Sequence, residues 1–148
     1  MKYLITLITF LLVVSCSQKN QLTYEERDIE YKQYITHNNI ADLKKVKNYQ
    51  FAGWQFLSRK FIILSGRFKR KYLIESSSNC YNLEFAKSLI INRSSKGNLH
   101  ARYDSLSTNE DPNLLCRIQT IYPLTVEQAK ELANIGVPTN EDTTSLDS

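Results

Sequence analysis

The side chains best suited to chemistry in this 148-residue chain are its cysteines and histidines, and their spacing argues against catalysis. Cys80 and Cys116 have no Cys-x-x-Cys partner, and the two histidines are His37 and His100. A nucleophilic cysteine needs a neighbouring base and an unbridged thiol. His100 and Asp104 would lie about 13 Å apart along a strand, too far for a direct hydrogen bond. We therefore expect His100 to be a surface strand residue and Asp104 a turn acid.

Motifs of known catalytic and cofactor sites are absent from the sequence. It contains no Gly-x-Ser-x-Gly, no His-Glu-x-x-His, no glycine-rich phosphate loop and no calcium-binding loop. We predict a protein that is not an enzyme and that holds no cofactor and no metal. The formal net charge of +4 is too small to indicate nucleic acid, so no nucleic-acid partner is expected.

The N-terminus has the pattern of an export signal. Met1 and Lys2 precede an apolar run over 3–14 that is too short to anchor the chain in a bilayer. The run ends in Val-Val-Ser-Cys at 13–16, which resembles the bacterial lipobox. This resemblance implies that residues 1–15 are a lipoprotein signal peptide and that Cys16 carries the lipid. An ordinary signal peptide with an incidental Cys16, or a buried N-terminal helix, is the alternative.

The residues after Cys16 bear on location. Ser17 follows the cysteine, where aspartate would favour retention in the inner membrane. By the same resemblance, we expect an outer-membrane lipoprotein that faces the periplasm and is held by acyl chains such as palmitate, which anchor firmly when several share one site. Residues 16–22 are polar enough to serve as a tether to the folded domain.

Lipid on Cys16 would leave an even pair of cysteines in an oxidising compartment. We predict a Cys80–Cys116 disulfide that closes a loop of about 37 residues, a constraint worth up to about 4 kcal/mol. A free redox thiol and a metal-binding pair are the alternatives.

Helix signals stand near both ends of the chain. Thr23 with Glu26 and Thr125 with Gln128 have the spacing of capping boxes. They predict helices over about 24–36 and 125–134, the second ended by Gly136. A short middle helix over 79–87 and a helical turn over 39–46 are also expected.

The remaining apolar runs predict strands. A hairpin is expected over 61–65 and 71–75, and its first strand is apolar on both faces. Further strands are expected at 54–57, 89–91, 99–103 and 114–121, with Pro123 ending the last. We predict a single α+β domain over 23–135, with about five mainly antiparallel strands and three helices. Residues 136–148 are expected to form a disordered acidic tail.

The predicted hairpin loop is the strongest charge feature of the sequence. Arg67, Lys69, Arg70 and Lys71 occur without an acidic residue among them. They are candidates for contact with an anionic surface, such as lipid headgroups, an anionic envelope polymer or an acidic protein. The alternative is a solvated loop whose charge discourages edge-to-edge association. Phe68, in the middle of this basic run, favours contact.

The order of these features resembles that of a family of small bacterial lipoproteins known as a domain of unknown function. The matching residues are Trp54, the basic turn, Tyr72-Leu73-Ile74, Cys80-x-x-Leu83, Asp104, Cys116-x-Ile118 and Leu124-Thr125. The resemblance covers about 40–133 and leaves the helix at 24–36 outside. It implies an envelope location and a cysteine pair, and it implies no activity.

Two functional hypotheses follow. The first is a lipid-anchored, non-enzymatic interaction or structural module of the cell envelope. The second is a periplasmic carrier of a small ligand or lipid, because nine Tyr and six Phe could line a cavity. The carrier hypothesis predicts an apolar pocket walled by these aromatic residues.

Overall fold

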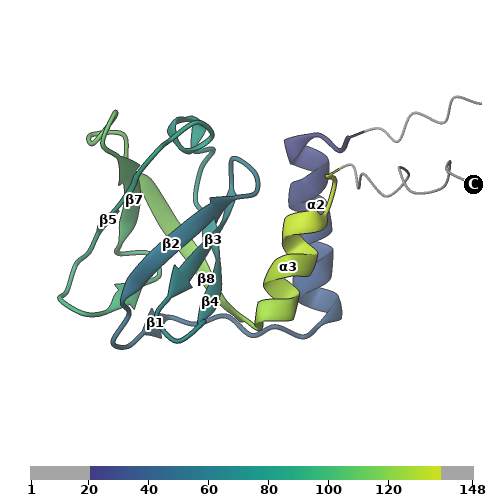
Figure 1. The fold of residues 1–148 in the computed structure, drawn as a ribbon, viewed down its shortest axis with the longest axis horizontal. Coiled ribbons are helices and arrows are strands. Elements are labelled where there is room, and N and C mark those ends of the chain that lie inside the picture. Colours follow the sequence, from purple (N-terminus) through teal and green to yellow (C-terminus); the bar gives the residue numbers. More distant parts are fainter. Residues whose placement is uncertain (1–20, 138–148) are drawn as a thin grey trace, which may run out of the picture.

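The structure is a computed structural model that describes residues 21–137, and it is built on a curved antiparallel sheet with two helices on one side (Figure 1). The predicted signal peptide, Cys16 and most of the predicted acidic tail lie outside the described residues. The elements are α2 (Tyr24–His37), β1 (Lys45–Val46), β2 (Phe51–Phe56), β3 (Phe61–Gly66), β4 (Lys71–Ser76), the 3-10 turn η1 (Tyr81–Leu83), β5 (Leu89–Asn92), β6 (Leu99–His100), β7 (Ser105–Thr108), β8 (Cys116–Leu124) and α3 (Val126–Asn134).

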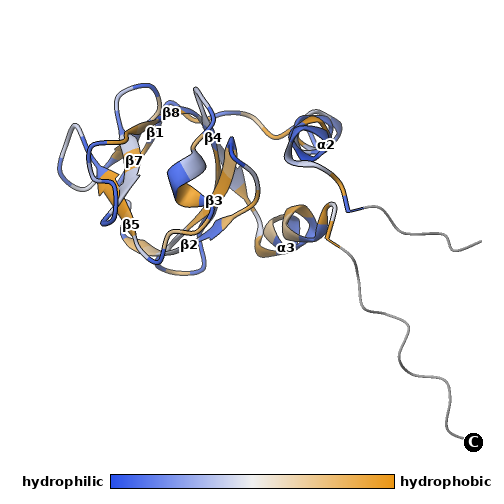
Figure 2. Cartoon of the chain, turned by 90° about the horizontal axis from the view of Figure 1, so that it is seen from above, coloured by the Kyte–Doolittle hydropathy of each residue, from blue (hydrophilic) through white to orange (hydrophobic). Residues whose placement is uncertain are grey.

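The six longer strands pair in the order β2-β3-β4-β8-β7-β5, and β1 pairs with β6. Seen from above, they form a near-barrel, with α2 and α3 together outside it (Figure 2). The α+β class and the antiparallel sheet are confirmed, while the number of strands exceeds the predicted five. Among residues 21–137, no helix has both the length and the apolar character needed to cross a membrane.

Strand β3 is buried on both of its faces, as its unbroken apolar run predicts. Phe61 and Ile63 pack towards the helices, whereas Ile62 and Leu64 pack into the barrel interior. These four side chains are at most 3% exposed. Because side chains alternate across a strand, one strand contributes to two separate cores.

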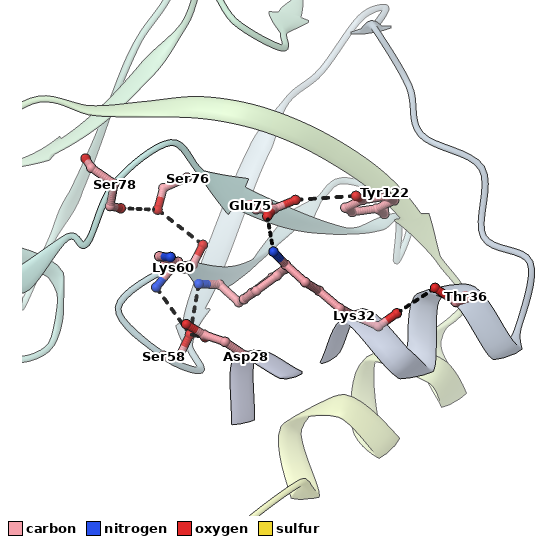
Figure 3. Close-up of polar contacts among 10 residues, drawn as sticks. Asp28, Lys32, Thr36, Ser58, Lys60, Glu75, Ser76, Ser78 and Tyr122 are labelled. Carbon is pink, nitrogen blue, oxygen red and sulfur yellow. Dashed lines mark hydrogen bonds and ion pairs between the residues drawn. The ribbon is translucent and has the colours of Figure 1, made fainter. Parts of the chain in front are cut away.

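Polar contacts also fasten α2 to the sheet (Figure 3). The Ser58 hydroxyl donates to Asp28, and Lys32 lies 3.3 Å from Glu75. The ion pair is largely exposed on the lysine side, so it adds little stability. Both capping boxes are formed, which confirms the two terminal helices and explains where each begins.

The predicted middle helix is wrong, since only η1 forms within 79–87. Contacts with distant segments hold this stretch in its largely non-helical path. The Cys80 backbone N–H donates to the Arg59 carbonyl at 2.7 Å, and the Asn82 side-chain Nδ2 donates to the Leu114 carbonyl at 3.2 Å.

The helical turn expected over 39–46 is wrong for the same reason. The Leu43 N–H donates to the Ile121 carbonyl at 2.7 Å, and Val46 pairs with Leu99. The strand expected over 99–103 stops at His100, because Arg102 has a φ of 70° and turns the chain.

Pro123 does not end its strand, contrary to expectation. It lies within β8, opposite Tyr72 of β4. Strand β7 pairs with β8 only at Cys116 and Arg117, so near residue 123 β8 has a ladder on one side alone. A proline is tolerated in a strand where its missing N–H faces no partner.

The predicted disulfide is confirmed. Cys80 and Cys116 are bonded, with their Cα atoms 5.8 Å apart, and they are 36 residues apart in sequence. Both are buried in the barrel core, at 1% and 3% exposure. The bond joins the segment that precedes η1 to the start of β8.

Candidate interaction surface at the basic end of the sheet

The loop between β3 and β4 places the predicted basic residues at one end of the barrel, the lower end in Figure 1. The Gly66 N–H donates to the Arg70 carbonyl at 2.8 Å, which closes the hairpin. Gly66 has little room for a side chain, because a Cβ there would lie 3.3 Å from the Tyr49 ring. The loop is therefore seated directly on Tyr49.

The tip of the hairpin is an exposed aromatic residue in an unfavourable backbone conformation. Phe68 is 87% exposed, and Phe68 and Lys69 have φ values of 59° and 58°. The left-handed region costs a non-glycine residue roughly 1–2 kcal/mol, and a bulky residue there is unusual. Phe68 projects from the tip and makes no core contacts that would offset this unfavourable backbone energy.

Three of the four predicted basic residues also hold the loop in place. Arg67 donates to the Gln50 side chain at 2.9 Å, Arg70 to the Asn48 carbonyl at 3.0 Å, and Lys71 to the Ser65 hydroxyl at 2.6 Å. Among the residues that the structure describes, the Lys69 ammonium has no such partner. Lys69 and Phe68 are thus the members of the loop most available to a partner molecule.

The structure adds two further basic segments that the sequence reasoning missed. The Tyr49 N–H donates to the Gly97 carbonyl at 2.7 Å, and Arg93 donates to the Tyr49 carbonyl at 3.2 Å. Segments 44–48 and 93–97 therefore lie beside the hairpin, around the buried Tyr49.

We call segments 44–48, 67–71 and 93–97 the basic end. None of their residues is acidic. Within residues 21–137, none of their lysines or arginines lies in an ion pair with a carboxylate. Like charges gathered without counterions create a local positive potential that attracts anions. The basic side chains are Lys44, Lys45, Lys47, Arg67, Lys69, Arg70, Lys71, Arg93 and Lys96.

The structure brings His100 and Asp104 together, which corrects the expectation that they lie far apart. The turn at Arg102 places His100 Nδ1 3.9 Å from Asp104 Oδ2. The buried carboxylate accepts from the His100 and Ser94 backbone N–H groups, each at 2.7 Å, and also from the Ser94 hydroxyl. The Ser94 hydroxyl donates to Asp104 at 2.7 Å and also lies 3.3 Å from His100 Nδ1. Asp104 holds two turns together.

The aromatic residues pack against one another. Tyr31 meets Phe61 with ring centroids 5.4 Å apart, and Tyr49 meets Tyr72 at 5.7 Å. Burial raises the pKa of Tyr31 to about 12 and that of Tyr49 still further. An open groove of about 580 Å³ between β2 and α3 is lined by Trp54, by the aliphatic Ile63 and Val126, and by small and polar residues, and no Tyr or Phe is in its wall.

Groups of three or more His, Cys, Asp or Glu side chains that could hold a metal ion are absent from residues 21–137.

A comparison with protein families gives one match. The model described as "Family of unknown function (DUF6491)" matches residues 1–134. The chain belongs to this family. The DUF6491 match includes α2, which the resemblance seen in the sequence left outside. No curated protein and no solved structure matches the chain.

Proposed function

We propose that this protein is a lipid-anchored component of the cell envelope, a non-enzymatic interaction module whose basic end binds an anionic polymer of the envelope. The observation that carries the proposal is the convergence of segments 44–48, 67–71 and 93–97 around Tyr49. Multivalent positive charge suits a polymer that carries many negative groups, because each neutralised group releases counterions.

The anchor is the lipid on Cys16 that the lipobox resemblance implies, in an outer membrane facing the periplasm. The described chain begins beside the N-terminus of α2, at the upper end of Figure 1, whereas the basic end lies at the lower end. A molecule held by Cys16 would point its basic end away from that membrane. This arrangement favours a polymer in the adjoining space over the headgroups of the anchoring bilayer.

The test is binding of the full chain, solubilised in detergent, to immobilised dextran sulfate, with neutral dextran as the blank. The variant Lys47→Gln, Lys69→Gln, Lys96→Gln removes one exposed lysine from each basic segment. We expect affinity at low salt to fall by about tenfold or more, and the slope of log affinity against log salt to decrease by about two to three.

A matched control has the same change in charge at the other end of the sheet. Lys60→Gln, Lys87→Gln, Arg117→Gln should bind as the unaltered chain does. If both variants lost the same affinity, the effect would come from net charge, and a defined binding site would be refuted. If an acidic protein bound strongly and dextran sulfate did not bind, the partner of the basic end would be a protein and not a polymer.

A further inference from the structure

The end of the barrel opposite the basic end carries a cluster of exposed apolar side chains, which we call the apolar rim. It consists of Tyr81, Phe85, Leu114 and Leu115, which are 59%, 86%, 52% and 56% exposed. Tyr81 and Phe85 lie in and after η1, and the two leucines directly precede β8. Such a group of large exposed apolar residues usually marks a contact with another surface.

The rim is held rigidly by the disulfide. Cys80 directly precedes Tyr81, and Cys116 directly follows Leu115, so the Cys80–Cys116 bond joins the two parts of the rim at their bases. The Asn82 amide adds a hydrogen bond to the Leu114 carbonyl at 3.2 Å. Two loops far apart in the sequence are thus held side by side at this end of the barrel.

The rim lies at the end of the domain where the N-terminal chain leaves it. The Tyr24 hydroxyl, at the start of α2, donates to Glu84 at 2.8 Å. The Arg59 guanidinium stacks on the rings of both Tyr24 and Tyr81, at 5.1 and 4.8 Å. The same guanidinium lies 3.5 Å from the Glu84 carboxylate. This ion pair offsets the negative charge of Glu84, which directly precedes Phe85.

A buried arginine fixes the direction in which the N-terminal chain leaves. Arg27 is 8% exposed and donates to the carbonyls of Leu22 at 3.2 Å and Gly136 at 3.1 Å. Gly136 has a φ of 69°, and a Cβ there would lie only 2.8 Å from Leu22 Cβ. Leu22 is therefore held against the C-terminal end of α3, at the upper end of Figure 1.

The length of the tether bears on which end of the domain lies nearer the membrane. Residues 17–22 span at most about 21 Å when fully extended. The six-residue strand β3, which runs from the rim end towards the basic end, is by itself about 20 Å long. Only a tether at almost full extension would let the basic end reach the bilayer, so a lipid on Cys16 favours contact through the rim end.

We propose that the apolar rim inserts into the interfacial layer of the same phospholipid bilayer that holds the lipid of Cys16, as a second attachment. This inference rests on the lipid anchor of the proposed function. Aromatic side chains favour the interfacial layer, and a second apolar contact strengthens attachment by acyl chains. The exposed acids Glu110 and Asp111 near the rim make a zwitterionic bilayer the better host.

The test uses tryptophan as a depth probe in the full chain. Trp54→Phe removes the single native tryptophan. Phe85→Trp then places the probe on the rim, and Phe68→Trp, in a separate chain, places it at the basic end. Both side chains are exposed, so neither substitution disturbs the core. The lipidated chains are reconstituted into phosphatidylcholine vesicles that contain brominated lipid.

We expect quenching of the Phe85→Trp chain to exceed that of the Phe68→Trp chain severalfold, with a blue shift only in the former. Equal quenching, or stronger quenching at position 68, would overturn the inference.

Mass spectrometry of Cys16 tests the anchor separately. If Cys16 is unmodified, its thiol is coupled to a maleimide phospholipid. The coupling is selective for Cys16, because the other two cysteines are bonded to each other. If the Phe85→Trp chain in that form is not quenched, insertion of the rim is refuted independently of the anchor.

Discussion

The residue types at the hairpin tip depart from those that its tight turn favours. Glycine and asparagine are the residues that tolerate the left-handed region, yet this chain has Phe68 and Lys69 there. Neither side chain compensates by packing, since both are exposed. Strained residues of this kind concentrate at functional sites. The Arg70 N–H donates to the Arg67 carbonyl at 3.4 Å, so Phe68 and Lys69 are the central residues of a tight hairpin turn that favours positive φ at both positions. The turn explains the backbone, and the choice of an exposed Phe and Lys where Asn-Gly would fit better supports the proposed contact with a partner.

Replacing Phe68→Asn together with Lys69→Gly should stabilise the fold. Relief of two left-handed residues is expected to raise the free energy of unfolding by about 1–2 kcal/mol, measured in urea. Binding to dextran sulfate should fall at the same time. Tyr103→Asn, which alters an exposed aromatic residue at ordinary φ, is the control and should leave stability within about 0.5 kcal/mol. A destabilised double variant would contradict the strain argument.

Helix α2 is an element whose packing on the sheet can be measured through a single phenol. Tyr31 is 1% exposed and lies against Phe61 of β3. Burial raises the pKa of Tyr31 from 10.0 to about 12, because the phenolate would lose its hydration in this core. The folded chain thus keeps the phenol neutral where the unfolded chain releases its proton.

The sign of the resulting pH dependence follows from linkage. The contribution of Tyr31 to stability is complete below pH 10.0 and is lost as the pH rises towards about 12. Tyr31→Phe should therefore make the free energy of unfolding fall less steeply over this interval, as measured by urea titrations at several pH values. Below pH 9 the difference in the free energy of unfolding between the native chain and the Tyr31→Phe variant should be constant. An unchanged slope above pH 10 would show that α2 does not bury this phenol.

On the scale of the whole molecule, the domain has two unlike ends. The segments that carry the apolar rim, the start of α2 and the end of α3 lie at one end of the molecule, and the basic segments lie at the other (Figure 1). The disulfide belongs to the rim end, where it joins η1 to β8. It therefore supports both the stability of the domain and the shape of the surface proposed to meet the bilayer.

Removing the disulfide with Cys80→Ala and Cys116→Ala should lower the free energy of unfolding by up to about 4 kcal/mol, since the unfolded chain regains the freedom of a long loop. Urea titration of the oxidised chain and the double variant measures the difference. Reductant should destabilise the native chain and leave the variant unchanged. A loss below about 1 kcal/mol would contradict a structural role.

The parts of the fold that the sequence predicts are those with local causes. Thr23 and Thr125 cap helices through hydrogen bonds that span only three residues. The β3–β4 hairpin follows from two apolar runs and a short loop. The pairing of Cys80 with Cys116 follows from the number of cysteines once Cys16 is assigned to the lipid. Each of these signals is complete within a short stretch or in the composition, so no knowledge of the rest of the chain is needed.

What tertiary structure alone decides is which distant segments meet. Helix propensity within 79–87 is overridden by bonds from Cys80 and Asn82 to distant carbonyls. Segments 44–48 and 93–97 join the hairpin because both reach Tyr49. The hairpin of the basic end could be found in the sequence, whereas its other two segments and the apolar rim could not. Their members are brought together by hydrogen bonds and a disulfide between residues more than thirty positions apart, and local sequence carries no record of such pairs.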